Sequence, residues 1–269
     1  MSHSISALTF KDEETILACT YGGDNAGNSA SIFVLNLKQI LTETMGQPDP
    51  SLFLYQLSFS SKVHNVGTGP IQQIKLSPDK KLLAAASTDG NAYFYDGSYT
   101  LSGKISVFPS SAGTSPVGGI DFSVCSRYLR CFGISFGLKS AIPVKYFDLQ
   151  QGTEEESSEF GSSLNNDASK LISMKDIKWS SVSSAAAPEA RGVMRNGVNI
   201  TSISSNSENI LVGYTDGAMS LFKLPVYSES SNSIQLCDFS GPVIVNMNDS
   251  NSFTVSSKSD GFFGCYSFN

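Results

Sequence analysis

Residues 74–96, IKLSPDKKLLAAASTDGNAYFYD, read as three short β-strands joined by two turns. A first short strand is followed by a polar turn around Ser77–Lys81, an apolar strand around Leu82–Ser87 and a second turn at Asp89-Gly90. Asp-Gly between two β-rich runs is a strong hairpin signal, because both turn positions tolerate positive φ. With the alternating strand that begins at Asn91, the stretch predicts an antiparallel meander.

The same order of strands and turns recurs along the chain. Copies downstream carry the turns Asp216-Gly217 and Asp260-Gly261, a degenerate copy begins at Ile120, and a copy near Leu8 has a longer turn in place of Asp-Gly. Without insertions the spacing is about forty residues, the period of a four-stranded propeller blade. Fainter fourth strands are expected at Leu54–Ser60, Gly103–Phe108, Ser173–Trp179 and Ser233–Phe239.

The predicted fold is all-β: one β-propeller region over residues 1–269, built from four-stranded blades of the WD-repeat type. About five blades are recognisable, which suggests a partial or fragmentary propeller. Their approximate ranges are 5–60, 69–108, 116–179, 198–239 and 241–269. Loops are expected at 42–51, 153–169 and 180–191, and residues 153–169 are expected to be flexible because they have too few apolar side chains to offset the ordering entropy.

Composition argues against several classes of function. The formal net charge is −6, whereas nucleic-acid binders present a strongly basic face. No apolar run approaches the ~20 residues that cross a bilayer, and residues 1–5 lack the features of a signal peptide. Five scattered cysteines without a Cys-x-x-Cys pair favour reduced thiols and a cytoplasmic location. Neither a nucleic acid nor a membrane is therefore expected as a partner.

The sequence also lacks the residue patterns that catalysis, zinc binding and phosphate binding require. Only His3 and His64 are available as histidine bases, and both lie in polar surroundings. Cysteine and histidine are not clustered as a zinc site requires, and no phosphate-binding glycine loop occurs. We therefore expect a non-enzymatic protein with no catalytic residue, cofactor, metal or small-molecule substrate. A propeller enzyme with polar groups around a central channel is the alternative.

The repeat resembles the WD-repeat family. The Trp-Asp dipeptide that ends the third strand of such repeats is replaced here by Tyr95-Asp96 and Phe147-Asp148, and the Gly-His dipeptide is absent from nearly every unit. The buried His–Asp network of a full WD blade is therefore not general in this chain. The hydrophobic pattern is retained despite these changes.

A narrower resemblance covers residues 116–268. MKDIKW at 174–179 lies between two blades, and the next blade ends with DGAMSLFKLP at 216–225. In this order, the segments resemble the C-terminal blades of the echinoderm microtubule-associated protein-like family. The residues that carry the likeness, and to which it gives a structural role, are Asp176, Trp179, Asp216 and Gly217.

The resemblance implies a cytoplasmic, cytoskeletal protein that binds tubulin or microtubules and has no catalytic activity. The basic, coiled-coil N-terminal region of that family is not seen here, and five units are fewer than the family's tandem propellers need. The sequence is therefore consistent with a C-terminal fragment, or with a reduced relative whose ring closes with few blades or with a partner's strands. A general scaffold for a complex unrelated to microtubules is the alternative function.

The candidate partner-binding residues are Lys11, Lys80, Lys81 and Arg127. They lie in the turns between the first and second strands of successive units, which emerge on one rim of a propeller. Tubulin is acidic, so a basic cluster there is a plausible contact. A solvated rim of mixed charge is the competing interpretation, because Asp12–Glu14 and Asp79 lie beside these lysines. For Trp179, packing between blades is favoured over an exposed anchor, since it shares a strand face with Ile177.

Overall fold

The structure of the chain is a computed structural model. The residues it describes are 4–21, 30–38, 42, 61–63, 69–108, 116–133, 144–149, 162–163, 177–185, 187–195, 197–206, 208–227, 233–247, 252–257 and 259–267.

Five antiparallel sheets make up the described part of the molecule, each a meander in which strands adjacent in sequence are paired. Sheet 1 contains β1 (Ser4–Phe10), β2 (Thr15–Tyr21), β3 (Ala30–Asn36) and β4 (Ser61–Val63). Sheet 2 contains β5 (Ile71–Leu76), β6 (Leu83–Ser87), β7 (Asn91–Tyr95) and β8 (Leu101–Ser106). Sheet 3 contains β9 (Val117–Phe122), β10 (Tyr128–Gly133), β11 (Val144–Asp148) and β12 (Ser162–Ser163).

The C-terminal part of the chain forms the other two sheets. Sheet 4 contains β13 (Ile200–Ser205), β14 (Asn209–Tyr214), β15 (Ala218–Lys223) and β16 (Ser233–Asp238). Sheet 5 contains β17 (Val243–Met247), β18 (Ser252–Ser257) and β19 (Phe262–Ser267). The all-β prediction is confirmed. None of the described helices is long and apolar enough to cross a membrane.

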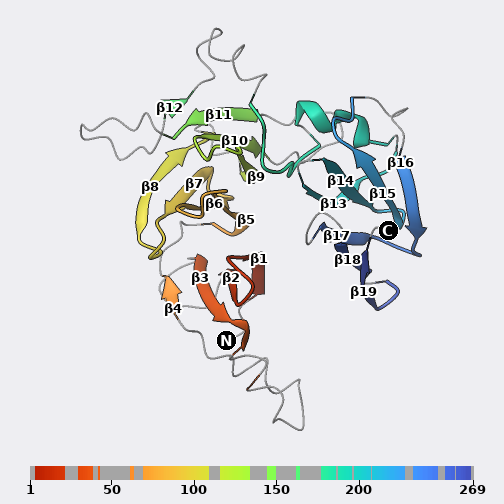
Figure 1. The fold of residues 1–269 in the computed structure, drawn as a ribbon, viewed down its shortest axis with the longest axis horizontal. Helices are drawn as coiled ribbons and strands as arrows, with labels where there is room; N and C mark the ends of the chain where they lie inside the picture. Colours follow the sequence, from red (N-terminus) through yellow and green to blue (C-terminus); the bar gives the residue numbers. More distant parts are fainter. Residues whose placement is uncertain are drawn as a thin grey trace.

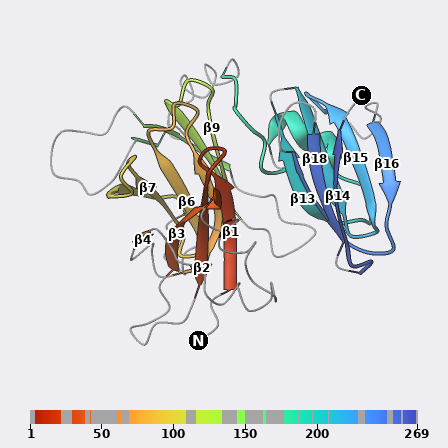
Figure 2. The same cartoon turned by 60° about the horizontal axis from the view of Figure 1, so that its bottom comes forward.

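The sheets follow one another in chain order along an arc (Figure 1). The first strand of each sheet lies on the inner side of this arc, and β1 packs against β5, β5 against β9, and β13 against β17. In the turned view, sheets 4 and 5 lie together beside the group formed by sheets 1 to 3 (Figure 2). Among the described residues, no substantial contact joins sheet 5 to sheet 1, so the described strands do not form a closed ring.

The hydrophobic core consists of separate layers between neighbouring sheets. Strand β6 shows how this works, because Leu83 and Ala85 pack toward sheet 1 whereas Ala84 and Ala86 pack toward sheet 3. Successive residues of a strand point to opposite faces, so a sheet between two others buries both sets. Small alanine side chains on both faces allow the backbones of adjacent sheets to approach closely. A third layer, which includes Val243, joins sheets 4 and 5.

Sheets 3 and 4 are joined through a connecting segment rather than by direct strand packing. The segment runs from Trp179 to the 3-10 helix η2 (Pro188–Val193). Its apolar side chains, Val182, Ala187 and Val193 among them, are buried in one cluster with Phe132 of β10 and residues of β14 and β15. Within the loop expected at 180–191, the described apolar residues Val182, Ala185, Ala187 and Ala190 are therefore part of the core, because they fill the space between two sheets.

The predicted fourth strands fit unevenly. Strands β8 and β16 match the predictions at 103–108 and 233–239 within a few residues. In sheet 1, residues 54–60 lie outside the described part, and Ser61–Val63 pairs with β3. In sheet 3, the paired fourth strand is Ser162–Ser163, inside the segment expected to be a flexible loop; of the strand predicted at 173–179, the described residues make only an isolated bridge from Trp179 to Ser123.

Candidate functional site

Two turns on one side of the arc have the same internal structure. Ser77 precedes the β5–β6 turn and Ser123 the β9–β10 turn. The Ser77 hydroxyl accepts a hydrogen bond from the Leu82 N–H at 3.0 Å, and the Ser123 hydroxyl accepts one from the Tyr128 N–H at 2.9 Å. Lys80 and Ser126 occupy matching positions with φ of 59° and 61°. The repeat predicted from sequence thus extends to the geometry of single turns.

These two turns contact each other directly. The Asp79 N–H donates a hydrogen bond to the Ser126 hydroxyl at 3.1 Å, which joins the rim of sheet 2 to that of sheet 3. Lys80 and Lys81 are both exposed beside this contact. The Asp79 carboxylate accepts hydrogen bonds from the Ser77 hydroxyl and the Lys81 N–H, and the bond from Ser77 is the main cause of a lowered pKa of Asp79. Asp79 therefore stays ionised and partly offsets the two lysine charges.

The other two candidate cations on this rim have partners of their own. Arg127 makes a bidentate ion pair with the buried carboxylate of Asp148, at 2.7 to 3.1 Å, and this hydrogen bonding raises the pKa of Arg127. The Lys11 ammonium lies 4.9 Å from the centre of the Tyr99 ring, in the β7–β8 turn of the next sheet. Both side chains are only partly exposed. The four candidates thus share a rim, and among the described residues Lys80 and Lys81 are the two that are exposed and make no ion pair.

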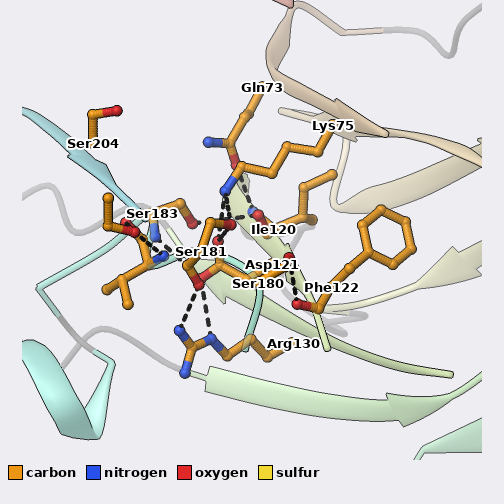
Figure 3. Close-up of polar contacts among 12 residues, drawn as sticks. Gln73, Lys75, Ile120, Asp121, Phe122, Arg130, Ser180, Ser181, Ser183 and Ser204 are labelled. Atoms are coloured by element: carbon orange, nitrogen blue, oxygen red, sulfur yellow. Dashed lines mark hydrogen bonds and ion pairs between the residues drawn. The ribbon is translucent and has the colours of Figure 1, made fainter. Parts of the chain in front are cut away.

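A buried polar network lies between sheets 2 and 3 and the connecting segment (Figure 3). Asp121 of β9 and Arg130 of β10 are opposite each other in the strand register and fully buried, and Arg130 Nε lies 3.0 Å from Asp121 Oδ2. Lys75 of β5 reaches across from sheet 2, with Nζ at 2.6 Å from Asp121 Oδ1. Ser181 and Ser183 of the connecting segment donate to the same carboxylate at 2.9 and 3.1 Å.

The Asp121 carboxylate is consequently saturated. A carboxylate has about four acceptor positions, and four donors occupy them here. Burial raises the pKa of Asp121, but the charges of Lys75 and Arg130 outweigh burial and hold that pKa below its ordinary value. The carboxylate is therefore ionised and has no remaining lone pair for a proton or a metal ion. The network links sheet 2, sheet 3 and the connecting segment.

Arg130 connects this network to helix η2 and to Trp179. Its Nη1 lies 2.6 Å from Glu189 Oε1, in a geometry that makes an ion pair but not a hydrogen bond, and its Nη2 donates to the Ser181 carbonyl at 3.1 Å. The guanidinium carbon is 4.4 Å from the centre of the Trp179 ring, within range of a cation–π interaction. Trp179 also lies 6.0 Å from the ring of Tyr146. Trp179 thus packs half-buried on sheet 3.

The residues of the family-like motifs lie apart from the rim lysines. Asp176 is outside the described residues. Asp216 is exposed, accepts a hydrogen bond from the Ala218 N–H and pairs loosely with Arg195 at 3.7 Å. Gly217 has φ of +90°, and its carbonyl accepts the Phe239 N–H at 2.9 Å. These two residues form the β14–β15 turn, consistent with a structural role.

Sequence reasoning did not identify the buried network. Its signal was present, since Asp121 lies between Ile120 and Phe122 and Arg130 between Leu129 and Cys131. A lone charge inside an apolar strand requires a buried partner, and hairpin register would have paired these two charges. Two free cysteines of sheet 3 differ in exposure: Cys131 is buried, whereas Cys125 is exposed in the β9–β10 turn.

Nothing in the described part of the chain gathers three or more potential metal-ligating side chains. No protein-family model and no curated protein matches the sequence.

Proposed function

We propose that the chain is a non-enzymatic protein-binding scaffold, built as a β-propeller of WD-repeat-type blades, that associates with tubulin or microtubules. The architecture supports the propeller, because sheets that are meanders in chain order stack through apolar layers with their first strands on the inside (Figure 1). The microtubule association follows from the likeness to the echinoderm microtubule-associated protein-like family. A cytoplasmic, cytoskeletal location belongs to the same proposal.

The observation that carries the binding role is the pair of matching turns at Ser77–Leu82 and Ser123–Tyr128. Their contact through Asp79 and Ser126 makes one continuous rim from two sheets. Among the described residues, no carboxylate makes an ion pair with Lys80 or Lys81. Exposed ammonium groups on one rim attract an acidic partner. An acidic surface such as that of tubulin fits this description.

Microtubule co-pelleting tests this surface. The double variant Lys80→Glu and Lys81→Glu is expected to reduce pelleting at least about tenfold at low salt, and wild-type pelleting is expected to weaken as salt rises. Lys104→Glu with Lys223→Glu is the matched control, because it makes the same charge change at exposed positions on β8 and β15. Unchanged, salt-insensitive pelleting of the rim variant would reject this surface.

A general scaffold unrelated to microtubules is the second candidate. The mixed charge of the rim favours it: Asp12, Glu13 and Glu14 are exposed beside Lys11, and Arg127 is neutralised by Asp148. Affinity purification from cell extract separates the two functions. Enrichment of tubulin above other abundant proteins supports the microtubule role, whereas a different set of partners that is still lost with the Lys80 and Lys81 variant supports the general scaffold.

A further inference from the structure

The outer edge of sheet 5 differs from the outer edges of the other sheets. Sheets 1 to 4 each have a fourth strand beyond the third, but in the described part of the chain sheet 5 ends at β19 (Figure 1). Strand β19 has the sequence FFGCYS, with no charged side chain and no proline. Phe263 is 71% exposed and Tyr266 is 41% exposed. Edge strands that stay unpaired are normally protected by charge, proline or a bulge, and β19 has neither charge nor proline.

The Asp-Gly turns show what a fourth strand does in this fold. Gly90, Gly217 and Gly261 occupy the same turn position and all have positive φ. The Gly90 carbonyl accepts the Val107 N–H at 3.0 Å, just after β8, and the Gly217 carbonyl accepts the Phe239 N–H at 2.9 Å, just after β16. In the described residues, nothing donates to the carbonyl of Gly261. An acceptor that the end of a fourth strand satisfies in sheets 2 and 4 thus has no donor in sheet 5 among the residues that the structure describes.

The surroundings of Gly217 and Gly261 differ as well. A Cβ atom placed on Gly217 would collide with the backbone of Phe239, whereas a Cβ atom placed on Gly261 would meet no atom of the described residues within 4 Å. The comparison is between equivalent turns of neighbouring sheets. The place taken by the end of β16 in sheet 4 is therefore filled by none of the described residues in sheet 5.

We propose that β19 is a docking edge for an extended segment of another protein, which adds antiparallel as the fourth strand of sheet 5 and donates its terminal N–H to the Gly261 carbonyl. This mode of recognition gains affinity from main-chain hydrogen bonds along an exposed edge. The added strand would pair with β19 in sheet 5 as β16 pairs with β15 in sheet 4. The proposal extends the scaffold function to a second surface, distinct from the lysine rim.

The chain's own fourth strands define the chemistry of that segment. Strand β8 leads into Val107 and Phe108, which are buried against sheet 3, and β16 leads into Phe239, whose ring lies 5.3 Å from that of Phe262 in sheet 5. A matching segment has about six residues of low charge in extended form, followed by a large apolar residue.

A peptide copied from this chain provides the probe. Residues 233–240, SIQLCDFS, are synthesised with serine in place of Cys237 and with a fluorescent label, beside a scrambled peptide of equal composition. Fluorescence anisotropy with the full chain is expected to show saturable binding of the copied peptide and at least about tenfold weaker binding of the scrambled one. Amide hydrogen exchange across Phe262–Ser267 is expected to slow on binding.

Gly261→Asn is the discriminating variant. Asparagine tolerates positive φ, and the site is open, so the fold is expected to persist, while the new side chain occupies the place of the incoming strand end. Peptide binding is then expected to fall at least about tenfold. Gly197→Asn is the control, because Gly197 also has positive φ (+75°) and a Cβ atom added there would meet nothing within 4 Å.

Three results would overturn the proposal. They are the absence of saturable peptide binding, equal binding by Gly261→Asn and wild type, and a concentration-dependent dimer that Gly261→Asn abolishes, which would assign the edge to a second copy of this chain. The Lys80 and Lys81 variant leaves β19 intact, so the microtubule proposal and the docking proposal can each fail without the other.

Discussion

At the scale of single residues, the network around Asp121 is the most exacting feature of the molecule. Two fully buried charges, Asp121 and Arg130, lie opposite each other in one hairpin, and Lys75 joins them from the neighbouring sheet. Removing one partner of a buried ion pair leaves the other charge uncompensated, which costs about 3–5 kcal/mol. The packing of sheet 2 on sheet 3 therefore depends on the charged groups of Asp121, Arg130 and Lys75.

Replacing Asp121 with Asn is expected to lower the free energy of unfolding by about 3 kcal/mol at pH 7, measured by urea denaturation. Asp260→Asn is the control, because Asp260 is an exposed turn residue. A loss no larger than that of the control would show that the buried charges are not coupled in this way.

The same variant carries a pH test. The pKa of Asp121 is lower in the folded state than the unfolded value of about 3.9. Its contribution is therefore fully present above that unfolded value and is lost as the pH falls below about 4. The stability difference between wild type and Asp121→Asn is expected to shrink between about pH 5 and pH 3. A constant difference over this range would contradict the account.

Gly217 gives a second test at the residue scale. Gly217→Ala is expected to lower the free energy of unfolding by at least about 2 kcal/mol, because the position combines positive φ with a backbone contact to Phe239. Gly197→Ala has positive φ in open space and is expected to cost only about 1 kcal/mol. Thermal and urea unfolding of both variants measure the difference, and equal losses would remove the role assigned to the contact.

At the scale of elements, the connecting segment from Trp179 to Val193 joins sheets 3 and 4, whereas the other neighbouring sheets pack through their strands. Phe132 of β10 is buried in the cluster formed by this segment and sheet 4. Phe132→Ala is expected to lower the free energy of unfolding by about 3–5 kcal/mol. Phe263→Ala removes the same atoms from an exposed position and is expected to change stability by less than about 0.5 kcal/mol. Similar losses of stability for both variants would show that Phe132 does not join sheet 3 to sheet 4.

Sequence reasoning succeeded where local signals decide the structure. The Asp-Gly turns and apolar strands of residues 74–96 and 209–223 follow from backbone preference and alternation, and they are found as predicted. It was less reliable where partners distant in sequence decide. Ser162–Ser163 forms a strand through pairing with Asp148 and Phe147, and Ala185, Ala187 and Ala190 are buried because two sheets enclose them. Neither the pairing of Ser162–Ser163 nor the burial of these alanines is marked by a pattern in the neighbouring sequence.

At the scale of the whole molecule, the account depends on sheets that stack in chain order. The layers between sheets 1, 2 and 3 and between sheets 4 and 5 have their own apolar clusters, and matching turns come together on one rim. Both proposed binding surfaces follow from this order. The lysine rim requires adjacent turns, and the open edge at β19 requires a sheet that repeats its neighbours except for one strand.

The most direct test of this stacking is disulfide formation between Asp79→Cys and Ser126→Cys, with Cys125 and Cys265 replaced by serine. These positions belong to different sheets, 47 residues apart, and the Asp79 N–H donates a hydrogen bond to the Ser126 hydroxyl at 3.1 Å. The account predicts that this pair oxidises in air to an intramolecular disulfide, visible as a mobility shift on a non-reducing gel. The pair Asp79→Cys and Asn206→Cys, with its second cysteine at the β13–β14 turn, is predicted to stay reduced. If the first pair stays reduced, or if both pairs oxidise equally, sheets 2 and 3 are not stacked as described.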